Sequence, residues 1–146
     1  MNREDIIKIA EKEIGYVEQQ GNKTKYGKWF GWDGVAWCGM FVSWVYDKTG
    51  NTIKGGGWIK GFAGCQYAFE KFKNKITKEP TKGDIVLFDW NGDGRYDHTG
   101  IFVKQISKDK FESIEGNTSI KNQSNGGQVM RRVRSYKNCI FLNLLK

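Results

Sequence analysis

The sequence has one proline, one histidine, three cysteines and no long apolar run, and these shortages exclude several classes of protein. Three cysteines leave at least one thiol unpaired, which excludes a small fold held together by disulfides. No apolar run is long enough to span a bilayer. The first residues, Met1-Asn2-Arg3-Glu4-Asp5, lack the apolar region of a signal peptide. If the protein acts outside its cell of origin, we therefore expect another device to release it.

The order of the predicted elements indicates an α+β fold. A chain of 146 residues is long enough to bury a real core, and we expect residues 1–146 to form a single domain. Before Pro80, apolar residues spaced three and four apart predict helices over 2–15, 37–50 and 58–72, with a loop over 16–35. After Pro80, short apolar or alternating segments predict strands over 84–89, 98–104, 110–115, 128–134 and 139–144. Helices followed by strands favour N-terminal helices packed on a C-terminal antiparallel meander.

The net charge of +8 is concentrated near the end of the chain. The segment 119–146 has no Asp or Glu, and its six cations are Lys121, Arg131, Arg132, Arg134, Lys137 and Lys146. A basic face attracts polyanions such as nucleic acid, anionic lipid or the acidic polymers of a bacterial wall. A solvated strand face that keeps the protein soluble explains the same charges equally well.

Cys38 is placed where a helix start can activate a thiol. The predicted helix from Trp37 follows Gly34, so Cys38 falls in or beside its first turn. Unpaired backbone N–H groups and the positive end of the helix stabilise a thiolate there. The alternative is a small buried hydrophobic residue, which is how we interpret Cys65 and Cys139.

The single histidine, His98, opens a predicted strand directly after the turn Asn91-Gly92-Asp93-Gly94. One strand later the chain reads Ser113-Ile114-Glu115-Gly116-Asn117. Alternation along a strand puts Glu115 and Asn117 on the same side if the strand continues through Gly116. Cysteine-protease chemistry needs a thiolate, an imidazole and a polar residue that orients the imidazole, and the sequence can supply each of them.

These segments together resemble the CHAP family, the cysteine- and histidine-dependent amidohydrolases/peptidases of bacterial and phage peptidoglycan. The resemblance is carried in order by the segments 37–44 (WCGMFVSW), 83–86 (GDIV), 97–101 (DHTGI) and 114–117 (IEGN). It implies the papain-like α+β fold shared with NlpC/P60 peptidases. By position it implies Cys38 as nucleophile, His98 as base, Glu115 as the residue orienting His98, and Asn117 as completing the site.

The resemblance implies a peptidoglycan hydrolase that cleaves an amide bond through a cysteinyl acyl-enzyme and requires no cofactor. The bond is in the stem or cross-bridge peptide, or joins N-acetylmuramate to L-alanine. A phage endolysin, an antibacterial toxin and a domain of a longer hydrolase all fit, and each reaches the wall after release. Peptidoglycan is the expected partner, with anionic wall polymers as a second candidate and nucleic acid disfavoured. The alternative function is a non-catalytic wall- or nucleic-acid-binding module that uses the basic C-terminal face.

Two further groups of residues are weaker candidates. Tyr26 and Trp37 lie beside the nucleophile and are candidates for substrate contact, although aromatic packing explains them at least as well. The loop 89–97 resembles the start of a calcium-binding loop, with oxygen ligands available from Asp89, Asn91, Asp93 and Asp97. Its twelfth position would be Gly100 instead of a glutamate, so a hairpin turn that needs no ion is the competing interpretation.

Overall fold

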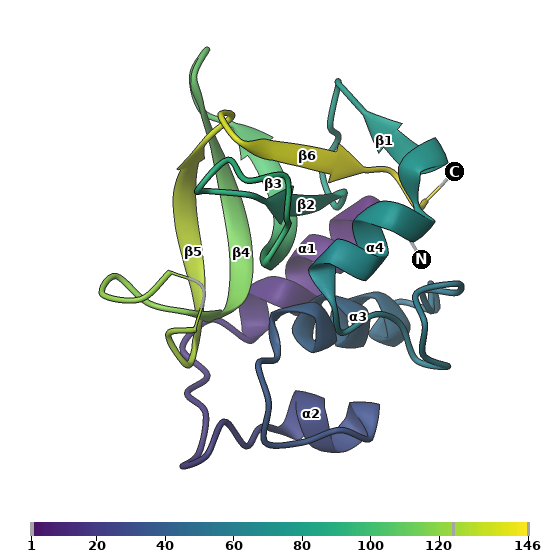
Figure 1. The fold of residues 1–146 in the computed structure, drawn as a ribbon, viewed down its shortest axis with the longest axis vertical. Coiled ribbons are helices and arrows are strands. Elements are labelled where there is room, and N and C mark those ends of the chain that lie inside the picture. Colours follow the sequence, from purple (N-terminus) through teal and green to yellow (C-terminus); the bar gives the residue numbers. More distant parts are fainter. Residues whose placement is uncertain (1, 124, 146) are drawn as a thin grey trace.

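The computed structural model describes residues 2–123 and 125–145, and Figure 1 shows their arrangement in space. The helices are α1 (Arg3–Lys12), α2 (Lys25–Phe30), α3 (Cys38–Lys48) and α4 (Cys65–Lys71), followed by the 3₁₀ turn η1 (Lys73–Lys75). The strands are β1 (Ile76–Thr77), β2 (Ile85–Phe88), β3 (His98–Gln105), β4 (Lys110–Thr118), β5 (Gln128–Ser135) and β6 (Cys139–Leu142). The predicted α+β fold is confirmed.

One antiparallel sheet has the strand order β1-β6-β2-β3-β4-β5. Strands β2 to β5 form the predicted meander. Strand β6 does not continue it, because it returns to the other side of β2, where Leu142 pairs with Ile85. The C-terminal strand therefore lies inside the sheet, between β1 and β2 (Figure 1).

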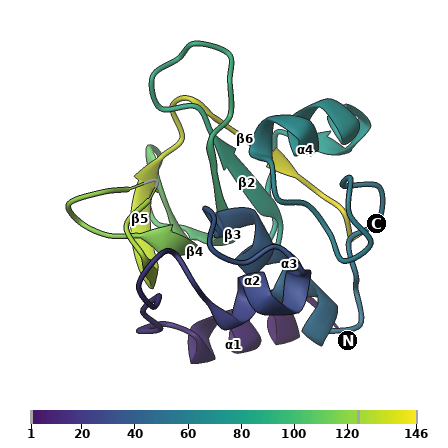
Figure 2. The ribbon, with the colours of Figure 1, turned by 60° about the horizontal axis from the view of Figure 1, so that its bottom comes forward.

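Helix α3 is the centre of the helical layer. It packs on β3 and β4 and also contacts α1 and α2, which lie with it on the same side of the sheet (Figures 1 and 2). Its residues Met40, Phe41 and Val45 are fully buried. The start of α3 is consequently fixed against the sheet, which is a requirement for a positioned nucleophile.

Strand β2 separates two apolar clusters because its side chains alternate between the two faces of the sheet. Ile85 and Leu87 belong to the main core, which contains the apolar residues of α1 and α3. Val86 and Phe88 belong to a smaller aromatic cluster with Phe111. All four β2 residues are fully buried, which explains why this strand is a continuous apolar run.

Three local predictions were wrong. Helix α1 ends at Lys12 instead of Gly15, and Ile14 is 38% exposed. The segment 58–64 is not helical, because Trp58 and Gly61 bridge to each other in a tight turn before α4 begins at Cys65. The predicted loop 16–35 contains α2, whose first turn is capped by the Thr24 hydroxyl accepting from the Gly27 N–H at 2.9 Å.

In the described part of the chain, no helix combines the length and the apolar character that crossing a membrane requires.

Candidate active site

Cys38 is the first residue of α3 and its side chain is almost fully buried. The preceding residue, Trp37, gives the helix no side-chain cap, so the first N–H groups face the cysteine and its surroundings. The Cys65 thiol is the main cause that keeps the pKa of Cys38 well below its usual range. The His98 ring and the Gly39 N–H act in the same direction, whereas burial opposes them. The site therefore favours a thiolate.

Cys65 begins α4 and is the residue that the sequence interpretation left in the core. It is buried, but its sulfur lies 3.9 Å from the sulfur of Cys38. The contact with Cys38 raises the pKa of Cys65 well above its usual range, and burial adds to the effect. These opposite pKa shifts favour Cys65 as the protonated member of the pair and as the donor to the Cys38 sulfur. A second cysteine was the only sequence signal, and the spacing of 27 residues gave no reason to pair them.

His98 is fully buried at the start of β3. Its Nε2 lies 2.9 Å from Oε1 of Glu115, which leaves Nδ1 for Cys38. Nδ1 has no hydrogen-bond partner of good geometry among the described residues. The ring is nevertheless close enough to Cys38 for the two groups to shift each other's pKa. Such loose contacts are common in enzymes without bound substrate.

The surroundings of His98 favour imidazolium over imidazole. Burial alone would lower the pKa of His98, but the contacts with Cys38 and Glu115 outweigh it and raise the pKa to about 9. The ring also lies beside two aromatic neighbours, with centroid distances of 5.3 Å to Trp90 and 5.8 Å to Phe88. The opposite pKa shifts of Cys38 and His98 favour a thiolate–imidazolium pair.

Glu115 is a fully buried carboxylate with several donors. Arg134 donates from Nε to Oε2 at 2.8 Å and from Nη2 to Oε1 at 2.6 Å, and the Ser113 hydroxyl also donates to it. Burial by itself would raise the pKa of Glu115, but Arg134 and then His98 lower it to about 2. A Cβ atom at Gly100 would lie 2.5 Å from Cγ of Glu115, so a glycine on β3 provides the space for this side chain.

The geometry brings together a helix-start thiol, a buried imidazole and a buried carboxylate. The imidazole lies between the thiol and the carboxylate, as nucleophilic amide hydrolysis requires. The CHAP domain family matches residues 29–117, which contain all three side chains. The chain belongs to the CHAP domain family. A search of curated proteins gave no match. CHAP membership makes the protein a peptidoglycan hydrolase of amidase or peptidase type, with peptidoglycan as substrate, and its α+β architecture is the papain-like one.

In this CHAP domain the side-chain amide of Asn117 bonds to the loop that follows β4. Its Nδ2 donates to Asn125 at 3.0 Å and its Oδ1 accepts from the Gly127 N–H at 3.0 Å, so it closes the loop between β4 and β5. The expected alternation fails because Asn117 has a φ of 58° and the pairing of β4 with β5 shifts between Glu115 and Thr118. A left-handed residue interrupts the strand periodicity on which the prediction depended.

The structure corrects the substrate contacts considered for Tyr26 and Trp37. Both side chains are fully buried, and their rings stack at a centroid distance of 5.4 Å. The Tyr26 hydroxyl donates to Glu13 at 2.6 Å and the Trp37 Nε1 donates to Glu18 at 2.8 Å. These two aromatic side chains pack beside the start of α3 and are not exposed to a ligand.

The loop 89–97 uses its carboxylates to hold its own backbone. Asp89 is buried and accepts from the Asp93 N–H at 3.2 Å and the Gly94 N–H at 2.8 Å. Asn91 donates to Asp93, and Asp97 lies at the far end of the loop beside His98. Within the described residues, no three His, Cys, Asp or Glu side chains form a group that could hold a metal. The four predicted calcium ligands are therefore not assembled into a cage.

The basic segment 119–146 is not one free cationic face. Arg134 is buried against Glu115, and its guanidinium lies 4.6 Å from the ring centroid of Trp90. Arg131 pairs with Glu11 at 2.8 Å and Glu112 at 2.7 Å. Lys121 and Lys137 are exposed, and Lys146 lies outside the described residues. Arg134 thus belongs to the candidate site, a role that the charge count could not reveal.

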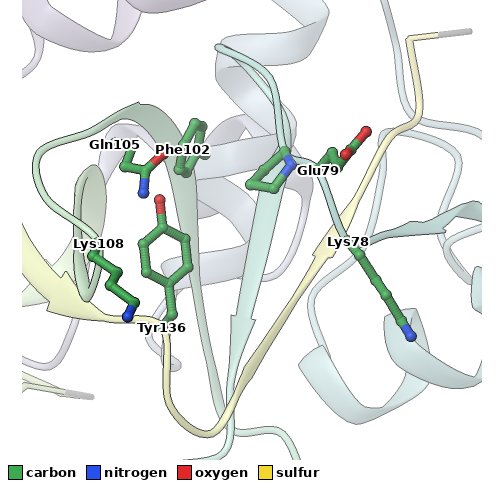
Figure 3. Close-up of a pocket in the computed structure, with 7 residues that line it drawn as sticks. Lys78, Glu79, Phe102, Gln105, Lys108 and Tyr136 are labelled. Carbon is green, nitrogen blue, oxygen red and sulfur yellow. The ribbon is translucent and has the colours of Figure 1, made fainter.

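A cavity of about 490 Å³ lies near the end of β3 that is opposite to His98, and Figure 3 shows the residues that line it. It is lined in part by Phe102, Gln105 and Tyr136, with Gln105 at the last position of β3. His98 is the first residue of the same strand, so the length of β3 separates this cavity from the nucleophile. The cavity therefore takes no part in the arrangement around Cys38.

Proposed function

We propose that this CHAP domain cleaves an amide bond of peptidoglycan with Cys38 as the nucleophile, His98 as the acid and base, and Glu115 as the residue that holds His98. One observation carries the proposal: the helix-start thiol meets a buried histidine whose other nitrogen is bound by a buried, ionised carboxylate. Arg134 keeps that carboxylate ionised and is a positioning residue.

The first half of the reaction forms an acyl-enzyme. The Cys38 thiolate attacks the carbonyl carbon, a C–S bond forms, and the carbonyl π electrons move to oxygen. The backbone N–H of Cys38, at the uncapped start of α3, is suited to donate to that oxyanion. As the C–N bond breaks, the proton on Nδ1 of His98 passes to the leaving amine.

The second half releases the acid. A water molecule attacks the thioester carbon while neutral His98 takes its proton at Nδ1. The C–S bond then breaks, a carboxylic acid leaves, and Cys38 is again a thiolate beside imidazolium. Throughout the cycle Glu115 stays bound to Nε2, which fixes the ring orientation and stabilises its charged form.

The experiment that tests the proposal is mass spectrometry of the muropeptides released from purified sacculi. Wild-type protein should release products with one new amine and one new carboxylate, and their masses identify the bond as one in the stem or cross-bridge or as the N-acetylmuramoyl-L-alanine bond. Cys38→Ala should release none above background. Cys139→Ala is the matched control and should leave release unchanged, because β2 separates Cys139 from His98 and its thiol donates to the backbone oxygens of Ser135 and Tyr136. Undiminished release by Cys38→Ala would overturn the assignment.

The setting of the reaction is a further part of the proposal. We propose action on the wall after release from a cell, as in a phage endolysin or a delivered toxin. Binding to anionic wall polymers is supported only by exposed cations such as Lys121 and Lys137. If these recruit the protein, salt should weaken lysis of whole cells more than hydrolysis of a soluble muropeptide. Wall binding by intact protein without any product would instead favour the non-catalytic module.

A further inference from the structure

An exposed aromatic pocket lies beside the candidate active site and is not used by the reaction described above. We call it the aromatic pocket: it has a volume of about 290 Å³ and is lined by Trp32, Trp58 and Tyr67 with the glycines Gly56, Gly57 and Gly64. Trp32 is 46% exposed, Trp58 42% and Tyr67 44%. Three large aromatic rings at one surface depression are unusual, because such rings are normally more buried.

The aromatic pocket has a defined shape. The rings of Trp32 and Trp58 stack with a centroid distance of 5.3 Å and an interplanar angle of 24°. Trp58 is held by the two backbone hydrogen bonds of its bridge to Gly61, each 3.3 Å long. A Cβ atom at Gly57, which has a φ of +96°, would lie 2.9 Å from the Tyr67 ring. A side chain there would press on the ring, so glycine keeps this wall of the pocket open.

The aromatic pocket is continuous with the surroundings of the nucleophile. Gly64 lines the pocket and is bonded to Cys65, whose sulfur lies 3.9 Å from that of Cys38. A Cβ atom at Gly39 would lie 2.9 Å from the carbonyl oxygen of Ala63, another lining residue. The loop that forms the pocket therefore runs directly against the first turn of α3, within reach of a polymer bound at Cys38.

The chemistry of the lining selects among the parts of peptidoglycan. No charged side chain lines the aromatic pocket. The neighbouring Lys60 donates from its ammonium to the backbone oxygen of Trp29 at 2.6 Å and does not line the pocket. Stem peptides carry free carboxylates and amines that need charged partners, whereas the acetylated sugars of the glycan strand present uncharged C–H faces that suit an aromatic ring. The volume of about 290 Å³ lies at the lower end of the range for ligand pockets, about 300–1,000 Å³, which suits a small ligand such as one sugar ring.

We propose that the aromatic pocket binds an N-acetylated sugar of the glycan strand and so positions the attached peptide over Cys38. This inference deepens the proposed function and rests on it. The probe is the tetramer of N-acetylglucosamine, which carries no peptide. It is titrated calorimetrically into the Cys38→Ala protein, so that binding is measured without turnover and independently of which bond is cleaved.

We expect the tetramer to bind Cys38→Ala, and Trp58→Ala in that background to weaken binding roughly tenfold through loss of the stacking face. Ile59→Ala is the matched control, because Ile59 is the adjacent residue, is 94% exposed and does not line the pocket. Tyr67→Ala removes a second ring from α4 and serves if Trp58→Ala does not fold, as checked by circular dichroism.

Two results would overturn the inference. The first is an absence of tetramer binding, or equal binding by the Trp58→Ala and Ile59→Ala proteins. The second is binding of a free stem peptide that depends on Trp58 when the tetramer does not bind, which would make the pocket a peptide subsite. Neither result concerns catalysis, because release of muropeptides by wild type and its loss in Cys38→Ala are measured separately.

Discussion

The sulfur of Cys65 lies 3.9 Å from the sulfur of Cys38 and is the largest influence that lowers the pKa of Cys38. Replacing Cys65 with Ala removes the donor, so the pKa of Cys38 should rise. Alkylation of Cys38 by iodoacetamide, followed by mass spectrometry, should then be several-fold slower at pH 6. Cys65→Ser retains a hydroxyl donor and should restore most of the rate. Identical pH profiles for Cys65→Ala and wild type would show that the thiol contact has no influence.

The same measurement separates the three cysteines. In wild type, Cys38 should be alkylated far faster than Cys65, whose pKa is raised by the contact with Cys38, or Cys139, whose pKa is raised to about 12 by burial. Only thiolates react at an appreciable rate. Faster labelling of Cys139 than of Cys38 would contradict the site geometry.

His98 is the single histidine, so its ring protons give isolated NMR signals. The ring should titrate near pH 9 in wild type and at lower pH in Cys38→Ala, because the thiolate is one of the two causes that raise its pKa. Considered alone, the raised pKa of His98 increases the free energy of unfolding. This contribution is complete below about pH 6.5 and is lost as the pH rises through about 9. The lowered pKa of Cys38 changes the stability with pH in the opposite direction. Titration of the His98 ring therefore measures the ion pair more directly than unfolding does. A midpoint near 6.5 in both proteins would disprove the ion pair.

Two arginines on β5 provide a matched comparison. Arg134→Ala leaves the buried Glu115 carboxylate without its main partner and should lower the free energy of unfolding by about 3–5 kcal/mol. Arg131→Ala removes two surface ion pairs and should cost no more than about 1 kcal/mol. Urea denaturation measures both. Adding Glu115→Gln to Arg134→Ala should recover part of the loss, and equal effects of the two arginine variants would contradict this account.

The loop 89–97 is expected to keep its shape through Asp89. Asp89→Asn weakens the bonds to two backbone N–H groups and should cost about 1–2 kcal/mol. Asp93→Asn, at an exposed position, should change little. Thermal unfolding with millimolar calcium and with a chelator should give the same midpoint. A calcium-dependent rise that is absent in Asp93→Asn would establish the ion instead.

Strands β2 to β6 were well predicted from the sequence because each is a short apolar or alternating segment between turn residues, whereas the two-residue β1 was not predicted. The order of the sheet was only partly predictable, since nothing local shows that β6 inserts between β1 and β2. The six-residue helix α2 was missed because it is too short for apolar periodicity, although Thr24 before it is a typical helix cap. Residues 58–64 of this glycine-rich region were assigned to a helix because Trp58 continues the apolar spacing of the residues in α4.

Within the candidate site, the grouping of Cys38, His98 and Glu115 could be predicted because Cys38 begins α3, His98 begins β3 and Glu115 lies on the neighbouring strand β4. Arg134 could not, because its strand partner is Phe111 and only its long side chain reaches Glu115. The role of Asn117 depended on strand alternation, which its own left-handed backbone interrupts. Sequence patterns describe the backbone well, but they do not show which long side chain crosses to which buried charge.

The position of Arg134 also matters for anyone who transplants this domain. The family match ends at residue 117, whereas the guanidinium that neutralises Glu115 comes from residue 134, and β6 fills the gap between β1 and β2. A fusion lysin cut at the family boundary would retain the nucleophile, the histidine and the carboxylate. It would lose the counter-charge together with strands β5 and β6, so chimeras should carry the chain through at least Leu142.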